Sequence, residues 1–197
     1  MNLRKLNITK VRIFDSYSSL DVPIVRAASR NGLALLGGTA VQLLARKYNV
    51  KERRSRSIND LDFLTSASNK EGIQAFKFSL KSTGFEPIKM GESEYMLNYE
   101  NSKEGVEVDC LISWEKNIED WFITVNGILT VSPVYMFLTK VQRIFSGLSS
   151  KNESDVQDLN TLYDIIESRN ELGLLESTIS EQASEVDIDK LNEYLQE

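Results

Sequence analysis

Short apolar runs and helical patterns follow one another up to about residue 132, and helical patterns alone follow after it. The run LALL (33–36) is apolar and is followed by glycines, so it predicts a short buried strand. An Asn-Gly pair at 126–127 predicts a hairpin, because both residue types accept the positive φ angles of a tight turn. The other expected strands are residues 60–66, 85–90, 94–100, 105–113 and the two arms within 122–132.

The expected helices cover residues 14–31, with a break around 21–23, then a segment from Thr39 onward, and residues 69–83, whose partly periodic apolar positions include Phe78. A further helix should begin at Ser132-Pro133, because a hydroxyl at the N-cap and a proline at the first position favour a helix start. The pattern predicts an α/β (α+β) fold with a mixed β-sheet flanked by helices. We expect an α/β core over residues 1–131 and a helical region over residues 132–197.

The amino-acid composition limits the kinds of catalysis that the chain could perform. No histidine occurs among the 197 residues, which excludes Ser-His-Asp and Cys-His catalysis and HExxH zinc sites. Catalysis would therefore rest on carboxylates, lysines, hydroxyls or the single thiol, Cys110, which is expected to be an inert core residue. Carboxylates favour Mg²⁺ or Mn²⁺. The net charge of −6 argues against a general nucleic-acid coat protein.

The location of the protein is predicted from the same counts. One cysteine allows no internal disulfide, which fits a reducing compartment. No apolar run approaches the ~18 residues of a membrane span, so we expect a cytoplasmic protein that does not enter the membrane. Trp114 and Trp121 are expected to be packing residues.

Two adjacent glycines, Gly37 and Gly38, separate the first predicted strand from the helix that follows. Glycine weakens both kinds of element by roughly 0.5–1 kcal/mol relative to alanine, so this position requires a sharp turn or a close approach. Exposed backbone N–H groups at a helix start can bind an anion such as a triphosphate. Tight packing of strand on helix is the structural alternative. The chain has neither a GxxxxGK[ST] nor a GxGxxG motif.

Carboxylates recur on two predicted strands. Asp60 and Asp62 project from the same face of their strand, because side chains alternate with a period of two. Asp109 shares a face with Glu107 in the valine-rich strand that follows. If the two strands are neighbours, three carboxylates converge and could hold two divalent ions roughly 3.5–4 Å apart, as in-line phosphoryl displacement requires. An acidic solvent-facing strand is the alternative explanation for either motif.

The order GGTA (37–40), SINDLDFL (57–64) and VEVDCLI (106–112) resembles the nucleotidyltransferase (DNA polymerase beta-like) superfamily. The form of these motifs is most similar to the AbiEii-type toxins of abortive-infection and toxin–antitoxin systems. The resemblance covers about residues 33–160 and implies a nucleotidyltransferase fold. It also implies that Asp60 and Asp62 ligate metal and that Asp109 is a third acid that activates the acceptor hydroxyl. The phosphates would be held by Gly37, Gly38 and Thr39.

Positive residues complete the site that the resemblance implies. Lys140 and Arg143 share a helix face and would clamp the triphosphate, with Lys151 as a second clamp oriented by Asp155 or Asp158. The Lys-Asp-x-x-Asp spacing of the family is imperfect here, and the gap between Gly38 and Asp60 is longer than usual. That gap holds a basic loop (47–59) that could guide a nucleic-acid acceptor through Arg53, Arg54 and Arg56. Solvated surface charge is the alternative for each of these residues.

Three functions fit these features. The first is a metal-dependent nucleotidyltransferase that uses an NTP with Mg²⁺ or Mn²⁺ and modifies RNA such as tRNA, a protein or a small molecule. As a toxin it would have an antitoxin partner, and a homodimer is possible. The second is a catalytically silent nucleotide- or partner-binding module of the same fold. The third, a metal-dependent nuclease, leaves the glycine pair without a role.

Overall fold

The computed structural model of the chain describes residues 21–52, 60–145 and 152–182. These residues group into two compact units. Of the described residues, the first unit takes 21–40 and 60–131, and the second takes 41–52, 132–145 and 152–182. The grouping of residues 41–52 with the C-terminal helices is not predicted by the sequence pattern.

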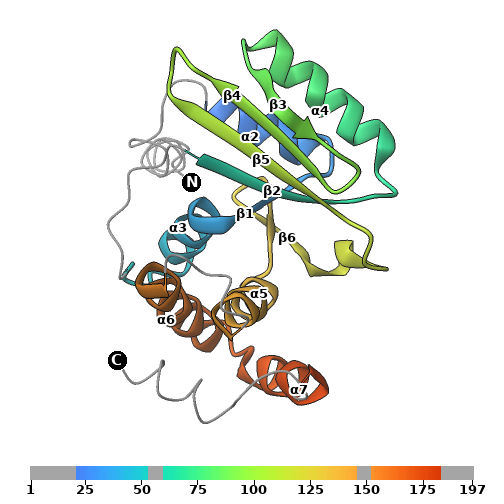
Figure 1. Cartoon of the computed structure of the whole chain (residues 1–197). Coiled ribbons are helices and arrows are strands. Elements are labelled where there is room, and N and C mark those ends of the chain that lie inside the picture. The colour runs from blue at the N-terminus through green and yellow to red at the C-terminus, as the bar shows by residue number, and fades with distance from the viewer. Residues whose placement is uncertain (1–20, 53–59, 146–151, 183–197) are drawn as a thin grey trace, which may run out of the picture. The chain divides into compact units, whose positions relative to one another are not determined.

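A seven-stranded mixed sheet forms the first unit, in the strand order β3-β4-β5-β2-β1-β7-β6 (Figure 1). The strands β2 and β5 are parallel neighbours, and β1 runs antiparallel to β2 and parallel to β7. The strand bounds are β1 (Ala34–Leu36), β2 (Asp60–Ser66), β3 (Glu86–Glu92), β4 (Met96–Asn101), β5 (Val106–Ser113), β6 (Phe122–Val125) and β7 (Ile128–Val131). The predicted mixed α/β fold is confirmed.

The described helices agree with the expected positions, with one correction at the start of the helix that follows the first strand. Their bounds are α2 (Asp21–Arg30), α3 (Gly37–Tyr48), α4 (Lys70–Ser82), the 3₁₀ turn η1 (Ile118–Trp121), α5 (Pro133–Phe145), α6 (Asn152–Ser168) and α7 (Leu172–Gln182). The break expected around 21–23 falls at the start of α2, which begins at Asp21 and includes Pro23 in its first turn, where proline is tolerated. Residues 14–20 lie outside the described residues. The helix α3 begins at Gly37 instead of Thr39 and continues into the expected basic loop as far as Tyr48.

One face of the sheet carries the core of the first unit. The helix α2 contacts α4 and the strands β1, β2 and β7. Phe63 of β2 meets Phe76 of α4 edge to face, with ring centroids 5.4 Å apart. Two expectations fail here. Phe78, part of the apolar pattern of α4, is 75% exposed, and Trp114, expected to pack, is 64% exposed.

The predicted turn and helix start are both confirmed. Asn126 and Gly127 have φ angles of 52° and 80°, and they join β6 to its antiparallel partner β7. The hydroxyl of Ser132 accepts a hydrogen bond of 3.3 Å from the backbone N–H of Tyr135, and Pro133 is the first residue of α5. Local residue chemistry therefore determines where the sheet ends and the helical region begins.

The second unit is helical in its described part. The helices α5, α6 and α7 all contact one another. The C-terminal end of α3 is held by Arg169, whose guanidinium lies 5.0 Å from the centroid of the Tyr48 ring and donates to the Tyr48 hydroxyl and to Glu171. Across the described ranges, no helix has the length and apolar character needed to cross a membrane.

Candidate active site

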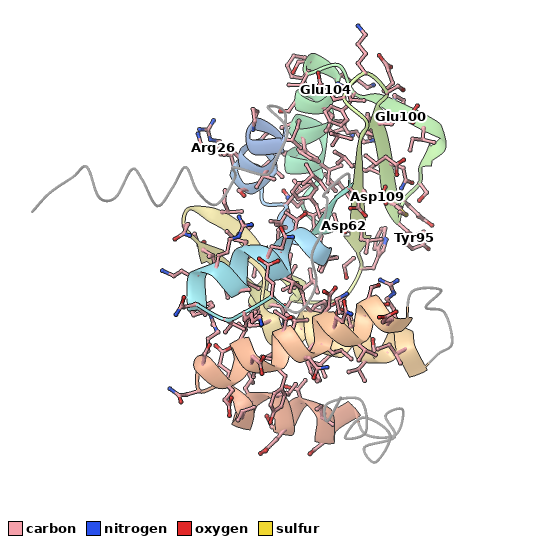
Figure 2. The ribbon with its side chains drawn as sticks, turned by 90° about the vertical axis from the view of Figure 1, so that its left-hand side faces the viewer. Arg26, Asp62, Tyr95, Glu100, Glu104 and Asp109 are labelled. Atoms are coloured by element: carbon pink, nitrogen blue, oxygen red, sulfur yellow. The ribbon has the colours of Figure 1, made fainter. Side chains whose placement is uncertain are left out.

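Asp62 and Asp109 are neighbours in the sheet. In the parallel pairing of β2 with β5, Asp62 lies opposite Asp109, and Asp60 lies opposite Glu107. Figure 2 shows Asp62 and Asp109 side by side on these adjacent strands. The two acidic strands are therefore neighbours, which meets the condition set for their carboxylates to converge, although the two motifs are separated by more than forty residues of sequence.

The two carboxylates project from the face of the sheet opposite the core described above. Leu61 and Phe63 of β2 are fully buried, whereas Asp62 between them is part-buried. The same alternation places Val108 and Cys110 in the core and Asp109 on the other face. Both acids are therefore held by strands whose opposite face is fixed by apolar packing, which keeps their backbone positions rigid.

Asp60 is the first residue of β2, two positions before Asp62; it is exposed and has Glu107 as its cross-strand neighbour. Within the described parts of the chain, no group of three acidic or thiol side chains is arranged to hold a metal ion. The adjacent pair Asp62 and Asp109 fits a divalent cation in donor type, because carboxylate oxygens are the ligands that Mg²⁺ and Mn²⁺ prefer. The fit thus rests on two carboxylates, with Asp60 nearby on the same strand.

Gly37 follows β1 at the point where Leu36 pairs with Asp62. Its φ angle is +67°, and a Cβ atom placed on it would lie 2.0 Å from Oδ2 of Asp62 and 2.8 Å from Cγ. A side chain is therefore excluded twice, once by the backbone conformation and once by the carboxylate. The requirement for glycine at this junction comes from the close approach of the backbone to an acid of the candidate site.

Replacing Gly37 with alanine is expected to weaken folding and to displace Asp62. The left-handed conformation costs an alanine about 1–2 kcal/mol, and the 2.0 Å contact adds the cost of moving the carboxylate. Gly105→Ala is the matched control, because Gly105 has a φ of +65° with no atom within 4 Å of the added Cβ. Denaturant unfolding of the two variants should show a larger loss for Gly37→Ala. Equal losses would mean that the Asp62 contact has no energetic consequence.

Asn98 is a member of this site that the sequence reading missed. It lies opposite Asp109 in the antiparallel pairing of β4 with β5, and its side-chain amide donates a 2.6 Å hydrogen bond to Oδ1 of Asp109. A signal was present in the sequence, since asparagine is depleted in strands and Asn98 stands between the buried Leu97 and Tyr99. Its partner could not be identified without the register of β4 against β5.

Cys110 is the buried, inert thiol that the sequence predicts. Burial, and secondarily the charge of Asp109, raises the pKa of Cys110 from the ordinary value of 9.0 to about 12. A thiol with so high a pKa carries almost no thiolate at neutral pH and is a poor nucleophile. The single cysteine of the chain is therefore no candidate for covalent catalysis.

The Cys110 thiol should make stability depend on pH in the alkaline range. Its folded-state pKa is raised, so its contribution is fully present below pH 9 and is lost as the pH rises from 9 towards 12. Unfolding free energies of the native protein should therefore fall more steeply above pH 9 than those of Cys110→Ala. Parallel curves would contradict the raised pKa. A thiol reagent at pH 8 should likewise react with the unfolded chain and leave the native protein unmodified.

The positive residues expected at the site lie in the second unit or outside the described residues. Lys140 is buried, and its Nζ is 2.9 Å from Oδ1 of Asp155 and 2.8 Å from Oδ2 of Asp158. Arg143 Nη2 lies 3.7 Å from Oδ2 of Asp155, and the Arg143 side chain is 54% exposed. The two aspartates expected to orient Lys151 therefore bind Lys140. Lys151, Arg53, Arg54 and Arg56 lie outside the described residues.

The two residues after Gly37 differ in their accessibility. Gly38 is part-buried in the first turn of α3, whereas Thr39 is buried. Both follow Gly37 directly, so the start of α3 lies next to Asp62. The start of α3 therefore lies on the same part of the sheet as the paired acids Asp62 and Asp109.

Solved structures with the same fold include several known proteins. The Megavirus polyadenylate synthase superposes with a TM-score of 0.55 at 16% identity, over 82% of this chain and 35% of that one. The antibiotic-resistance factor ANT(2'')-Ia superposes with a TM-score of 0.53 at 12% identity, over 90% of this chain and 94% of that one. JHP933 from Helicobacter pylori superposes with a TM-score of 0.51 at 17% identity, over 86% of this chain and 76% of that one.

No protein-family model matches the sequence, and no curated protein matches it. Identities of 12–17% with the solved structures are evidence for the fold alone. The expected fold is confirmed by these neighbours, whereas the AbiEii-type subfamily is not established by them. The chain has the nucleotidyltransferase fold, with Asp62, Asp109 and Gly37 brought together on one face of its sheet.

Proposed function

We propose that the protein is a metal-dependent nucleotidyltransferase that moves a nucleoside monophosphate from an NTP to an acceptor hydroxyl. The observation that carries the proposal is the pairing of Asp62 with Asp109 beside Gly37. Two carboxylates on adjacent strands offer the oxygen ligands that a divalent cation prefers. The start of α3 next to them suits an anion, so one place can accept a metal–triphosphate substrate.

The reaction forms a bond between the acceptor oxygen and the α-phosphorus and breaks the bond from that phosphorus to the bridging oxygen, so that pyrophosphate leaves. Asp62 and Asp109, with Asp60 on the same strand as Asp62, would hold the cation of the substrate, and Asp109 would also accept the proton of the acceptor hydroxyl. Gly37, Gly38 and Thr39 lie at the helix start that receives the phosphates. A divalent ion bound by these acids supplies charge neutralisation for the triphosphate. The remaining contribution of the protein is positioning.

The cations proposed for the triphosphate differ in exposure. Lys140 is enclosed by Asp155 and Asp158, whereas the Arg143 side chain is half exposed. Arg143 is therefore the better supported of the two, and Lys140 is better suited to hold α5 against α6. Lys151 as a further clamp, and Arg53, Arg54 and Arg56 as contacts for a nucleic-acid acceptor, rest on the sequence alone.

The finer parts of the proposal rest on the sequence resemblance to AbiEii-type toxins. They comprise Mg²⁺ or Mn²⁺ as the metal, RNA such as tRNA or a protein as the acceptor, and a cytoplasmic toxin role. An antitoxin protein and a homodimer are the corresponding partners. A catalytically silent binding module of the same fold remains the alternative outcome of the test.

The test is to incubate the protein with Mg²⁺ and cell extract, using each of the four NTPs labelled either at the α- or at the γ-phosphate. Label should pass to an acceptor from an α-labelled NTP and not from its γ-labelled form. Transfer from the γ-position would identify a kinase. Nucleotide binding without any transfer would support the silent module, and RNA fragments without label would support a nuclease.

A further inference from the structure

We infer that Asn98 is a positioning residue that fixes the carboxylate of Asp109 for cation binding, an inference that rests on the proposed function. Its amide donates to Oδ1 of Asp109 at 2.6 Å, a short distance typical of a hydrogen bond to a charged acceptor. Among the described residues, Asn98 is the one donor recorded for Asp109. One oxygen of the carboxylate is thus occupied, and Oδ2 is left for a ligand.

The register of the sheet determines from which side Asn98 approaches the carboxylate of Asp109. The strand β5 lies between β4 and β2, so Asn98 and Asp62 flank Asp109 from opposite sides in one row across three strands. Asn98 therefore holds the carboxylate from the side away from Asp62. A cation between Asp62 and Asp109 would meet a carboxylate whose rotation is already restricted.

The burial of Asn98 indicates that this hydrogen bond is not a requirement of core packing. Asn98 is part-buried on the acid face of β4, while Leu97 and Tyr99 on either side fill the core. A part-buried amide can be solvated, so the strand does not need Asp109 to satisfy it. Residues that orient a metal-binding carboxylate through a hydrogen bond commonly contribute 10–100-fold to metal affinity.

The experiment is a titration of the full chain with Mn²⁺ alone, with free Mn²⁺ measured by electron paramagnetic resonance. The variants Asn98→Leu and Asn98→Ala both remove the donor, and the smaller alanine serves if leucine prevents folding. Each should raise the Mn²⁺ dissociation constant by about 10-fold or more. Met96→Leu is the control on the same strand and face, and it should bind as the natural protein does. Thermal unfolding confirms that each variant is folded.

Asp109→Asn separates failure of this inference from failure of the proposed function. If Asp109→Asn weakens Mn²⁺ binding while both Asn98 variants bind normally, Asn98 has no positioning role and the metal site stands. If Asp109→Asn binds Mn²⁺ as tightly as the natural protein, or if the natural protein binds none, the proposed metal site is overturned and this inference with it. Loss of thermal stability without loss of Mn²⁺ affinity in the Asn98 variants would assign them a structural role and contradict the inference.

Discussion

Replacing Asp109 with asparagine is expected to lower the rate of nucleotide transfer by at least about 10²–10³-fold, the usual loss when one electrostatic element of an active site is removed. The change keeps the size of the side chain but removes its charge and its ability to accept the acceptor proton. Asp62→Asn should have an effect of similar size, because Asp62 is the register partner of Asp109 and the side chain nearest Gly37. The measurement is the initial rate of transfer from α-labelled NTP.

Glu107→Gln is the matched control for this prediction. Glu107 lies on the same strand and the same face as Asp109, is exposed, and pairs with Asp60 instead of Asp62. Neutralising it should change the rate by no more than about threefold, since an exposed charge is screened by solvent. If Asp109→Asn retained a rate close to that of Glu107→Gln, Asp109 would be an ordinary surface acid.

Replacing Lys140 with methionine is expected to destabilise the protein by about 3–5 kcal/mol, because it leaves two buried carboxylates without their cation. Lys140 is 8% exposed, and Asp155 and Asp158 are 4% and 2% exposed. Arg143 contacts Asp155 at 3.7 Å and compensates in part. For a chain of this length the change corresponds to a melting temperature lower by roughly 6–20 °C. The measurement is thermal or denaturant unfolding.

Two further variants identify the cause of that loss. Arg143→Met should cost less than about 1 kcal/mol, because the arginine side chain is half exposed. Combining Lys140→Met with Asp155→Asn and Asp158→Asn should recover much of the stability, since no buried charge is then left unpaired. A triple variant as unstable as Lys140→Met would show that lost packing, and not the uncompensated charge, is responsible.

Much of the fold follows from local residue patterns. The strand DLDFLTS has the predicted bounds, the Asn126-Gly127 turn has the predicted conformation, and α5 begins at Pro133 with Ser132 as its cap. Each of these is decided by residues within a few positions of one another. The adjacency of β2 and β5 does not follow from such local patterns. It was the condition under which their carboxylates would converge, and the parallel pairing of the two strands meets it.

The parts that were missed depend on contacts between distant residues. The sequence suggests two roles for Lys140, a triphosphate clamp or a solvated surface charge. Neither role indicates that Lys140 is buried between Asp155 and Asp158 of α6. Asn98 could not be assigned to Asp109 without the register of β4 against β5. Gly37 was identified as a special position, but its contact with Asp62 requires the pairing of β1 with β2.

In the proposed site, Asp62 and Asp109 together bind the cation of a metal–NTP substrate beside Gly37. The most direct test is a crystal structure of the chain with Mn²⁺ and a non-hydrolysable NTP analogue, with manganese located by its anomalous signal. We expect a manganese ion within coordination distance of oxygens from both Asp62 and Asp109, with the triphosphate next to Gly37 at the start of α3. Manganese bound to neither acid, or a triphosphate held away from Gly37, would contradict it.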